Sequence, residues 1–529
     1  MKLTLAGIKD RQSWEEAGIE LPKYDIDKMR TKTKELPIWV HFGAGNIFRI
    51  FAGGIAEQLL EEGEITQGIT CVEVFDKDVI DQIYAPYDNL VLSATLKSDG
   101  SVEKKVVASL AEAFKADRVR LREIMRNPGL MMVSFTITEK GYALKAADGS
   151  YFPWIQEEIE KGPEHASSAM GIVCGQLYER YQAGKMPIAM VSMDNCSHNG
   201  EKLADAMLTI AREWADRGYV EKGFVDYLKD EEKVSFPWSM IDKITPRPAD
   251  SVCEELTKLG IEKMAPVITS KRTYIAPYVN AEGPQYLVIE DRFPNGRPPF
   301  EKAGVYMTDR DTVNKVERMK VTTCLNPLHT ALAAYGCVLG YTLIADEMKD
   351  EELCRLIRRI GPEEGMKVVT DPGILSPEEF VREVIEVRFP NPFMPDTPQR
   401  IITDTSQKVG IRFGETIKSY VMEYGDAKKL TGIPLAIAGW CRYLLAVDDG
   451  GQRFALSDDP MLEELTGMLT GIEIGKPESY TGQLKPLLSN AYIFGSDLYQ
   501  AGIGNMIENM FVEEIQGPGA VRKTLKKYL

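Results

Sequence analysis

A glycine-bearing segment, HFGAGNIFRI (41–50), directly follows the apolar run PIWV. Gly43 and Gly45 stand where a predicted buried strand gives way to a predicted helix. In such a turn, backbone N–H groups and the positive end of the helix point at one place, where a pyrophosphate can bind. The third glycine of the usual pattern is replaced by Phe48. The residues that we expect to contact a dinucleotide are Gly43, Gly45, Asn46, Ile47 and Phe48.

An acidic residue, Asp76, follows the second predicted strand, GITCVEVF (68–75). A carboxylate there accepts hydrogen bonds from ribose hydroxyls and repels a 2′-phosphate, so it favours NAD over NADP. Two other interpretations fit the same residues. The segment is a strand–helix turn that binds no ligand, or it belongs to an S-adenosylmethionine enzyme, a class with a similar glycine-rich turn and a similar acid.

Short apolar runs alternate with helical patterns in the first half of the chain. These runs are PIWVHF (37–42), GITCVEVF (68–75), LMMVSFTIT (130–138) and PIAMVSMDN (187–195). Nearly continuous apolar composition is typical of parallel strands that are buried on both faces. The alternation therefore predicts an α/β fold with an N-terminal Rossmann-type, doubly wound parallel sheet.

Helical patterns dominate from about Val321 onward, and they predict a mainly α-helical C-terminal domain. The proline-dense stretch FPNPFMPDTPQR (389–400) is expected to be a surface loop between two of these helices. We predict two domains: residues 1–290 bind NAD, and residues 291–529 carry the substrate and catalytic groups.

Composition excludes several classes of protein. A net charge of −16 argues against a nucleic-acid surface, and the eight scattered cysteines, with only four histidines, argue against a metal site. The N-terminus has no apolar stretch long enough for a signal peptide, and the apolar run 331–345 is too short to span a membrane and reads as a buried helix. We expect a cytoplasmic protein without a membrane partner, for which a monomer is possible.

Six further segments carry a resemblance to a known family. They are TITEKGY (136–142), SMDNCSHNG (192–200), FPWSMIDKITP (236–246), VIEDRFPNGRPPFEKAGV (288–305), ERMKVTTCLNPLH (317–329) and DTPQRIITDTSQK (396–408). In their order and spacing they resemble the polyol-specific long-chain dehydrogenases/reductases, the mannitol dehydrogenase family. Members are metal-free, NAD(P)-dependent alcohol dehydrogenases with a Rossmann domain and a helical C-terminal domain, and they carry their dinucleotide turn at the position of HFGAGNIFRI.

The resemblance implies four residues with catalytic roles. Lys320 matches the family's catalytic base, which a lysine can be only where its surroundings favour the neutral amine. Asn195 and Asn326 match a pair of asparagines whose amide N–H groups hold the reacting oxygen, and Glu139 matches a glutamate of a proton relay. Without the resemblance, Lys320 would be a surface lysine, Asn195 a turn residue, Asn326 a helix N-cap before Pro327, and Glu139 a salt-bridge partner of Lys140 or Arg49.

Four residues match positions that bind the substrate. The family's histidine, matched by His329, hydrogen-bonds a substrate hydroxyl. Arg400 and Lys408 match two basic residues at the far end of the substrate, where an arginine also binds a carboxylate through two parallel hydrogen bonds. Asp242 matches a carboxylate near the substrate. The alternatives are a structural histidine, two solvated charges, and a loop aspartate paired with Lys243 or Arg247.

The chain departs from the family pattern between Lys320 and Asn326, where five residues stand in place of four. If Lys320 lies on the same helix as Asn326, one added residue turns it by about 100° relative to that asparagine.

From the overall resemblance we expect an NAD-dependent oxidoreductase that interconverts D-mannonate and D-fructuronate. A mannitol 2-dehydrogenase, another polyol dehydrogenase or a tagaturonate reductase is the alternative within the family. Outside it, a group transferase or a non-catalytic nucleotide-binding protein uses a similar sheet, but neither needs the cluster of Lys320, Asn326 and His329.

Overall fold

The computed structural model describes residues 1–97 and 99–529. The chain divides into two compact units, an N-terminal unit (Met1–Asn314) and a C-terminal unit (Lys315–Leu529). The helix α10 (Arg310–Met319) spans the boundary between them. The domain boundary predicted after residue 290 stays a prediction. The compact N-terminal unit ends later in the chain, at Asn314.

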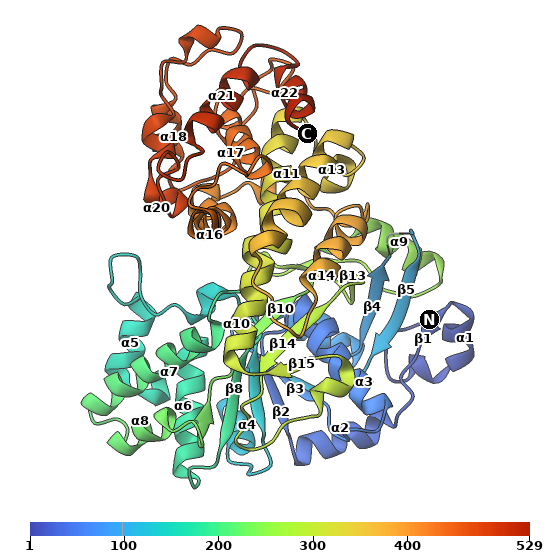
Figure 1. The fold of residues 1–529 in the computed structure, drawn as a ribbon. Coiled ribbons are helices and arrows are strands. Elements are labelled where there is room, and N and C mark those ends of the chain that lie inside the picture. Colours follow the sequence, from blue (N-terminus) through green and yellow to red (C-terminus); the bar gives the residue numbers. More distant parts are fainter. Residues whose placement is uncertain (98) are drawn as a thin grey trace. The chain divides into compact units, whose positions relative to one another are not determined.

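A six-stranded, all-parallel sheet forms the centre of the N-terminal unit (Figure 1). Its strands are β2 (Trp39–Phe42), β3 (Ile69–Glu73), β6 (Leu110–Lys115), β7 (Met132–Phe135), β8 (Ile188–Ser192) and β9 (Val234–Ser235). Their spatial order is β6-β3-β2-β7-β8-β9. Numbered along the chain as one to six, they stand in the order 3-2-1-4-5-6, which places the topological switch point between β2 and β7.

Apolar side chains cover both faces of this sheet. One core joins Phe42, Val133 and Met190 to the helices α4 (Arg118–Met125), α5 (Pro153–Lys161), α6 (Ala169–Gln182), α7 (Asn199–Asp216) and α8 (Lys222–Lys229). A second core joins Trp39, Cys71 and other side chains of the opposite face to α3 (Gly53–Glu61) and the turns beside it. Strands buried on both faces explain the continuous apolar runs of the sequence. The predicted doubly wound sheet is therefore confirmed.

Smaller sheets, which the sequence did not predict, complete the N-terminal unit. Strands β1 (Ile19–Glu20), β5 (Val102–Val107), β4 (Val91–Leu96) and β13 (Tyr278–Glu282) form one sheet, and β10 (Ser239–Asp242), β14 (Tyr286–Glu290) and β15 (Tyr306–Thr308) form another. The pair β11 (Val267–Ile268) and β12 (Tyr274–Ile275) stands apart. The remaining helices are α1 (Arg11–Glu16), α2 (Ile26–Glu35) and α9 (Asp250–Lys258).

The C-terminal unit is mainly helical, as predicted. Its buried centre is α11 (Asn326–Leu339), which packs on α17 (Gly432–Tyr443), and α17 packs in turn on α21 (Gly504–Glu514). The other helices are α12 (Ile344–Glu347), α13 (Glu351–Arg358), α14 (Pro377–Glu383), α15 (Pro398–Ile401), α16 (Glu415–Tyr424), α18 (Leu462–Met468), α19 (Lys485–Leu488), α20 (Ala491–Phe494) and α22 (Ala520–Tyr528). The apolar run 331–345 contributes to α11 only as far as Leu339, because Gly340 ends the helix in a left-handed conformation.

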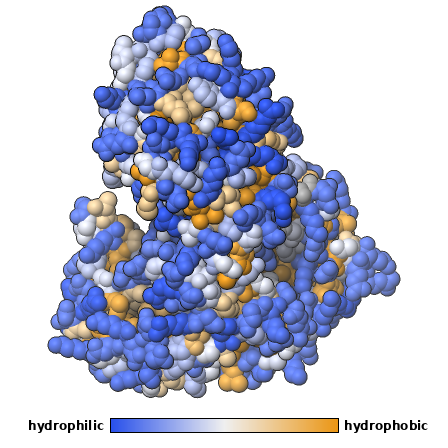
Figure 2. Space-filling view, in the orientation of Figure 1, coloured by the Kyte–Doolittle hydropathy of each residue, from blue (hydrophilic) through white to orange (hydrophobic). Residues whose placement is uncertain are grey.

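Hydrophilic side chains cover most of the face shown in Figure 2, and apolar residues are scattered among them. Among residues 1–97 and 99–529, no helix is long and apolar enough to cross a lipid bilayer.

A buried acid joins two of the central helices in the C-terminal unit. The Tyr335 hydroxyl lies 2.7 Å from the Leu435 carbonyl oxygen and 2.6 Å from Glu514 Oε1. One hydroxyl proton cannot serve both acceptors, so a protonated Glu514 that donates to the tyrosine oxygen satisfies the arrangement. Burial accordingly raises the pKa of Glu514 to about 8, although Tyr335 and Arg442 oppose the shift.

The replacement Glu514→Gln tests this protonation. Because the pKa of Glu514 lies above its ordinary value of 4.5, the folded chain keeps a proton that the unfolded chain loses, and the free energy of unfolding falls as the pH rises from about 4.5 to 8. Glutamine keeps a donor for Tyr335 and cannot ionise. We expect the variant to exceed the wild type by about 1–3 kcal/mol at pH 9 and to lose this pH dependence. Thermal unfolding between pH 6 and 9 measures it.

The neighbouring Glu513 supplies the control, because it pairs with Lys527 at the surface. Glu513→Gln should leave the wild-type pH dependence in place. An unchanged pH dependence in Glu514→Gln would show that Glu514 is ionised in the folded protein.

Candidate active site

The turn after β2 is too narrow for any residue except glycine. Gly43 has φ +111°, and a Cβ atom there would lie 2.3 Å from the Thr136 carbonyl oxygen. Thr136 follows β7, so the close approach is at the switch point of the sheet, where dinucleotides bind in this fold. A Cβ atom at Gly45 would meet nothing within 4 Å, which leaves open space beside the start of the helix.

Phe48 explains the missing third glycine of the pattern. Its ring stacks on the imidazole of His41, with 4.0 Å between the ring centroids. Trp39 Nε1 donates to Ser134 Oγ, so the serine hydroxyl is free to donate to His41 Nδ1, and Nε2 then donates to Thr136 Oγ1. Burial lowers the pKa of His41 to about 3, so the ring is neutral. The aromatic stack thus takes over the close helix–strand packing that a glycine usually allows.

Glu73 is the last residue of β3 and Asp76 follows it, and the two acids differ in what they bind. Both oxygens of Glu73 accept backbone N–H groups, from Ala44 at 2.8 Å and from Phe75 at 2.8 Å. Asp76 Oδ2 accepts a hydrogen bond from Thr269 Oγ1 at 2.6 Å, and its buried Oδ1 has no partner among the described residues. Glu73 therefore holds the glycine turn, and the spare oxygen of Asp76 suits the ribose hydroxyl that we predicted for it.

The other predicted cofactor contacts are the first residues of the helix. Asn46 Oδ1 lies 3.3 Å from Nη1 of the buried Arg49, which also donates to the Ala276 carbonyl oxygen at 2.8 Å. Ile47 packs on the core of the N-terminal unit. Arg49 is thus a structural residue of the N-terminal unit and does not pair with Glu139.

A strained turn follows β7 in the motif TITEKGY. Thr138 has φ +64° and ψ 159°, a conformation that β-branched residues rarely adopt. The Asp194 carboxylate holds it: Oδ1 accepts the Thr138 N–H at 2.8 Å and Oδ2 accepts the Ile137 N–H at 3.0 Å. The Tyr142 hydroxyl donates to the same carboxylate at 2.5 Å. Burial raises the pKa of Asp194, and these three hydrogen bonds oppose the shift.

Asn199 connects the same region to β10. Its side-chain amide lies 3.0 Å from both the Asp194 and the Ser239 carbonyl oxygens, and its oxygen accepts the Ser239 N–H. The segments that carry Glu139, Asn195 and Asp242 are therefore joined by hydrogen bonds of Asp194 and Asn199. Sequence reasoning missed both residues, although they stand within the SMDNCSHNG motif.

Three residues of the N-terminal unit were assigned to catalysis or substrate binding, and they differ in exposure. Asn195 is exposed at the carboxyl end of β8, as expected for a ligand contact in such a sheet. Asp242 is buried and ends β10, where it pairs with Tyr286 of β14, so it is a strand residue and not a loop residue. Glu139 forms an ion pair with Lys202 of α7, a partner that the sequence-based alternatives did not include.

In the C-terminal unit, Lys320 is buried and opens a π-helical turn, Lys320–Cys324. The N–H of Leu325 donates to the Lys320 carbonyl oxygen at 3.1 Å, the five-residue spacing of a π-turn. Such a turn holds one residue more than an α-helical turn, so it accommodates the extra residue before Asn326. Lys320 is therefore not a surface lysine.

Asn326 and His329 lie in the first turn of α11. The half-buried Asn326 side chain makes no hydrogen bond within the part of the chain that the structure describes, so its alternative role as a helix cap is wrong. His329 Nε2 lies 2.9 Å from Asp396 Oδ2, and its ring stacks on Phe389. Burial lowers the pKa of His329 despite Asp396, whereas His329 and Arg400 hold the pKa of Asp396 at about 2 against the effect of burial.

The two predicted basic residues have different surroundings. The side chain of Arg400 is 65% exposed and forms an ion pair with Asp396. Lys408 is half-buried, and its Nζ donates to the Thr403 carbonyl oxygen. Burial and the neighbouring Arg412 lower the pKa of Lys408. Sequence reasoning missed Arg412 and Asp396, although Arg412 stands four residues after Lys408 and Asp396 four residues before Arg400.

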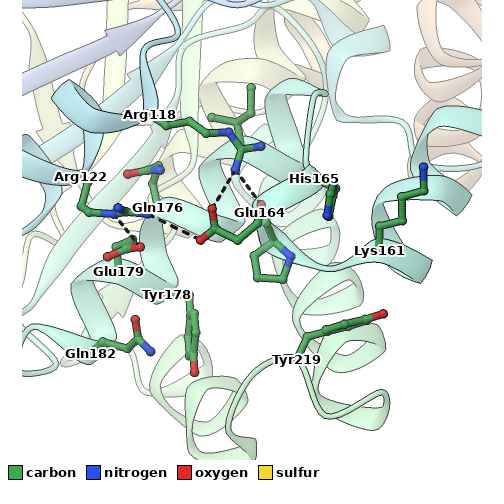
Figure 3. A pocket seen from close by; sticks show the side chains of 13 residues that line it. Arg118, Arg122, Lys161, Glu164, His165, Gln176, Tyr178, Glu179, Gln182 and Tyr219 are labelled. Carbon is green, nitrogen blue, oxygen red and sulfur yellow. Dashed lines mark hydrogen bonds and ion pairs between the residues drawn. The ribbon is translucent and has the colours of Figure 1, made fainter.

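A pocket of about 380 Å³ elsewhere in the N-terminal unit contains none of these residues (Figure 3). Its charged side chains already have partners: Arg122 Nε donates to Glu179 at 2.9 Å, and Arg118 donates to the Pro163 carbonyl oxygen at 3.1 Å. The pocket is distinct from the candidate active site.

The strand order and the glycine turn at the switch point define a Rossmann-type, dinucleotide-binding class of protein. The model of the mannitol dehydrogenase Rossmann domain matches residues 37–302, and that of the mannitol dehydrogenase C-terminal domain matches residues 312–514. The chain belongs to the mannitol dehydrogenase family, a family of dehydrogenases, and the resemblance seen in its sequence is confirmed.

Three relatives illustrate the similarity. A D-mannonate oxidoreductase from Thermotoga maritima is 54% identical, and the alignment covers 100% of this chain and 99% of that protein. The crystal structure of a D-sorbitol dehydrogenase in substrate-free form is 25% identical, with a TM-score of 0.76 over 94% of this chain and 97% of that chain. The ternary complex of Pseudomonas fluorescens mannitol 2-dehydrogenase with NAD and D-mannitol is 26% identical. Its TM-score is 0.70, and the match covers 100% of this chain and 99% of that chain.

The strain at Thr138 generates a prediction about Asp194. Asp194→Asn removes one acceptor oxygen and leaves a partly buried N–H unpaired, so we expect a loss of about 1–2 kcal/mol in the free energy of unfolding. Because the carboxylate offsets the strain at Thr138, Thr138→Gly should recover part of that loss in the double variant. Urea unfolding of the two single variants and the double variant measures the coupling.

Asp148 is the matched control, because its carboxylate also accepts a backbone N–H, from Ser150, but in an exposed turn. Asp148→Asn should cost less than about 0.5 kcal/mol. Strict additivity of the Asp194 and Thr138 effects would mean that the carboxylate does not hold the strained turn.

Proposed function

We propose that the protein is a metal-independent, NAD-dependent oxidoreductase that interconverts D-mannonate and D-fructuronate. In the direction of reduction, the ketone takes a hydride from NADH and a proton, and it yields the secondary alcohol and NAD. The full-length identity of 54% with the Thermotoga maritima D-mannonate oxidoreductase carries this proposal.

The residues around the glycine turn fit a dinucleotide. The narrow turn at Gly43 leads into a helix whose first N–H groups are suited to a pyrophosphate, and Asp76 offers one unpartnered carboxylate oxygen to a ribose. The family relative from Pseudomonas fluorescens binds NAD. Bound NAD would supply the hydride acceptor, while the residues of this chain bind and orient the reactants and move the proton.

The proton chemistry falls to residues that the family resemblance selects. We propose that Lys320 takes the hydroxyl proton during oxidation, and its burial is the condition under which a lysine amine can act as a base. Asn195 and Asn326 would donate amide N–H groups to the oxygen as negative charge develops on it. Glu139, exposed and paired with Lys202, would connect the base to solvent.

Substrate hydroxyls would be held by His329 and Asp242. His329 Nε2 lies 2.9 Å from Asp396 and burial lowers the pKa of the imidazole, which suits the ring to exchange hydrogen bonds with a hydroxyl. Asp242 can accept hydrogen bonds from hydroxyls. Arg400 and Lys408 would contact the far end of the substrate.

A substrate panel tests the proposal and separates it from the alternatives. Formation or consumption of NADH would be measured with D-mannonate, D-fructuronate, D-tagaturonate, D-mannitol, D-arabinitol and D-fructose, with NAD and NADP in parallel. Turnover of D-mannonate and D-fructuronate with NAD is expected. Turnover of D-mannitol or D-tagaturonate alone would assign the protein to another branch of the family. No turnover of any compound in the panel would contradict the proposal.

The replacement Lys320→Met tests the proposed base. Methionine preserves the volume of the buried side chain but cannot accept a proton, so we expect kcat to fall by about 10²–10⁴-fold while NADH still binds. Steady-state kinetics and NADH fluorescence titration measure the two effects. Lys349→Met, at an exposed position paired with Asp346, should leave both unchanged. Full activity in Lys320→Met would favour a different base or a non-dehydrogenase function.

A further inference from the structure

Three cations gather in the C-terminal unit beside His329. They are Arg400, Lys408 and Arg412, defined here as the basic cluster. Asp396 forms ion pairs with both His329 and Arg400. The Arg412 side chain donates to Thr330, the neighbour of His329, and its backbone N–H donates to the Lys408 carbonyl oxygen at 3.0 Å, so the four groups are close in space. In a chain with a net charge of −16, such a concentration of positive charge indicates a place for an anion.

The cations of the basic cluster differ in how they are compensated. Arg400 is largely exposed and already forms an ion pair with Asp396. Lys408 and Arg412 are half-buried, and among the residues that the structure describes neither has a carboxylate in an ion pair. Asp404 and Asp459 lie near enough to raise the pKa of Lys408, but Asp459 accepts hydrogen bonds from Ser406. Within residues 1–97 and 99–529, no carboxylate forms an ion pair with the partly buried guanidinium of Arg412.

The backbone fixes the direction of Arg412. It lies in the π-helical turn Gly410–Gly414, whose two glycines pack against the backbone of α20. A Cβ atom at Gly410 would lie 2.8 Å from the Ile493 carbonyl oxygen, and one at Gly414 would lie 2.0 Å from that of Phe494. Arg412 stands two residues from each glycine, so its side chain projects from the opposite side of the turn.

One guanidinium nitrogen of Arg412 is held in place. Its Nη1 donates to Thr330 Oγ1 at 2.6 Å, and that hydroxyl donates to the Asn326 carbonyl oxygen at 2.9 Å. Thr330 is the neighbour of His329 on α11. The single bond orients the guanidinium toward the first turn of α11 and leaves its other N–H groups for a ligand. An arginine oriented in this way is suited to a planar carboxylate.

We propose that Arg412, together with Lys408, binds the carboxylate of the sugar-acid substrate and so gives the enzyme its preference for a hexonate over a polyol. This inference rests on the proposed function and assigns the carboxylate to a residue other than Arg400, whose charge is offset by Asp396. A polyol offers only a neutral hydroxymethyl group at the same end and cannot neutralise the two cations.

The replacement Arg412→Gln tests the assignment. Arg412 would hold the remote end of the substrate equally in the ground and transition states, so its loss should raise KM and leave kcat nearly unchanged. We expect KM for D-fructuronate to rise about 10- to 100-fold, with kcat within about three-fold of the wild type. Arg412→Lys keeps the charge but not the paired N–H geometry, so its KM should lie between those of the wild type and Arg412→Gln.

Two further variants distinguish binding from structure. Thr330→Val removes the hydrogen bond to Arg412 but keeps the guanidinium, so KM should change less than in Arg412→Gln. An equal rise would show that the hydrogen bond to α11, and not the guanidinium charge, accounts for the effect of Arg412. Arg382→Gln removes an exposed positive charge from α14 and should change neither constant. Activity of the wild type on D-fructuronate with an unchanged KM in Arg412→Gln would overturn this inference alone, whereas an inactive wild type would overturn the proposed function.

Discussion

The close approach between the turn after β2 and the end of β7 is the constraint on which the candidate cofactor site depends. With no room for a side chain at Gly43, the chain passes within van der Waals contact of Thr136 and enters the helix at the switch point of the sheet. His41 secures the same junction, because its ring joins Ser134 and Thr136 by hydrogen bonds and stacks on Phe48. Packing and hydrogen bonds within the N-terminal unit thus define the path of the backbone there.

Polar groups in the two units serve two different purposes. Asp194 and Glu514 are buried carboxyl groups that complete hydrogen-bond networks of the protein itself, and they satisfy backbone or tyrosine partners. The basic cluster differs, because among the described residues neither Lys408 nor Arg412, both half-buried, has a carboxylate in an ion pair. An unpaired charge is costly to bury, and this cost is the physical basis of our proposal that the cluster binds an anion.

Two π-helical turns of the C-terminal unit carry residues with proposed roles. The turn Lys320–Cys324 widens the helix by one residue ahead of Asn326, which resolves the irregular spacing of the motif. The turn Gly410–Gly414 directs Arg412 away from α20. In both turns, the π-helical spacing changes which side chains lie on the same face of the helix. Counting residues with an α-helical period does not predict this change.

The sequence by itself determined the class of fold, because apolar runs of strand length separated by helical patterns have few arrangements other than a doubly wound sheet. Its rare motifs also determined the family. Only the tertiary structure decided the partners: Asp194 holding Thr138, Asp396 beside His329, Lys202 on Glu139, and Thr330 beside Arg412. The two residues in each of these contacts are far apart in the chain. Tertiary packing brings them together, and no local sequence pattern predicts such a pair.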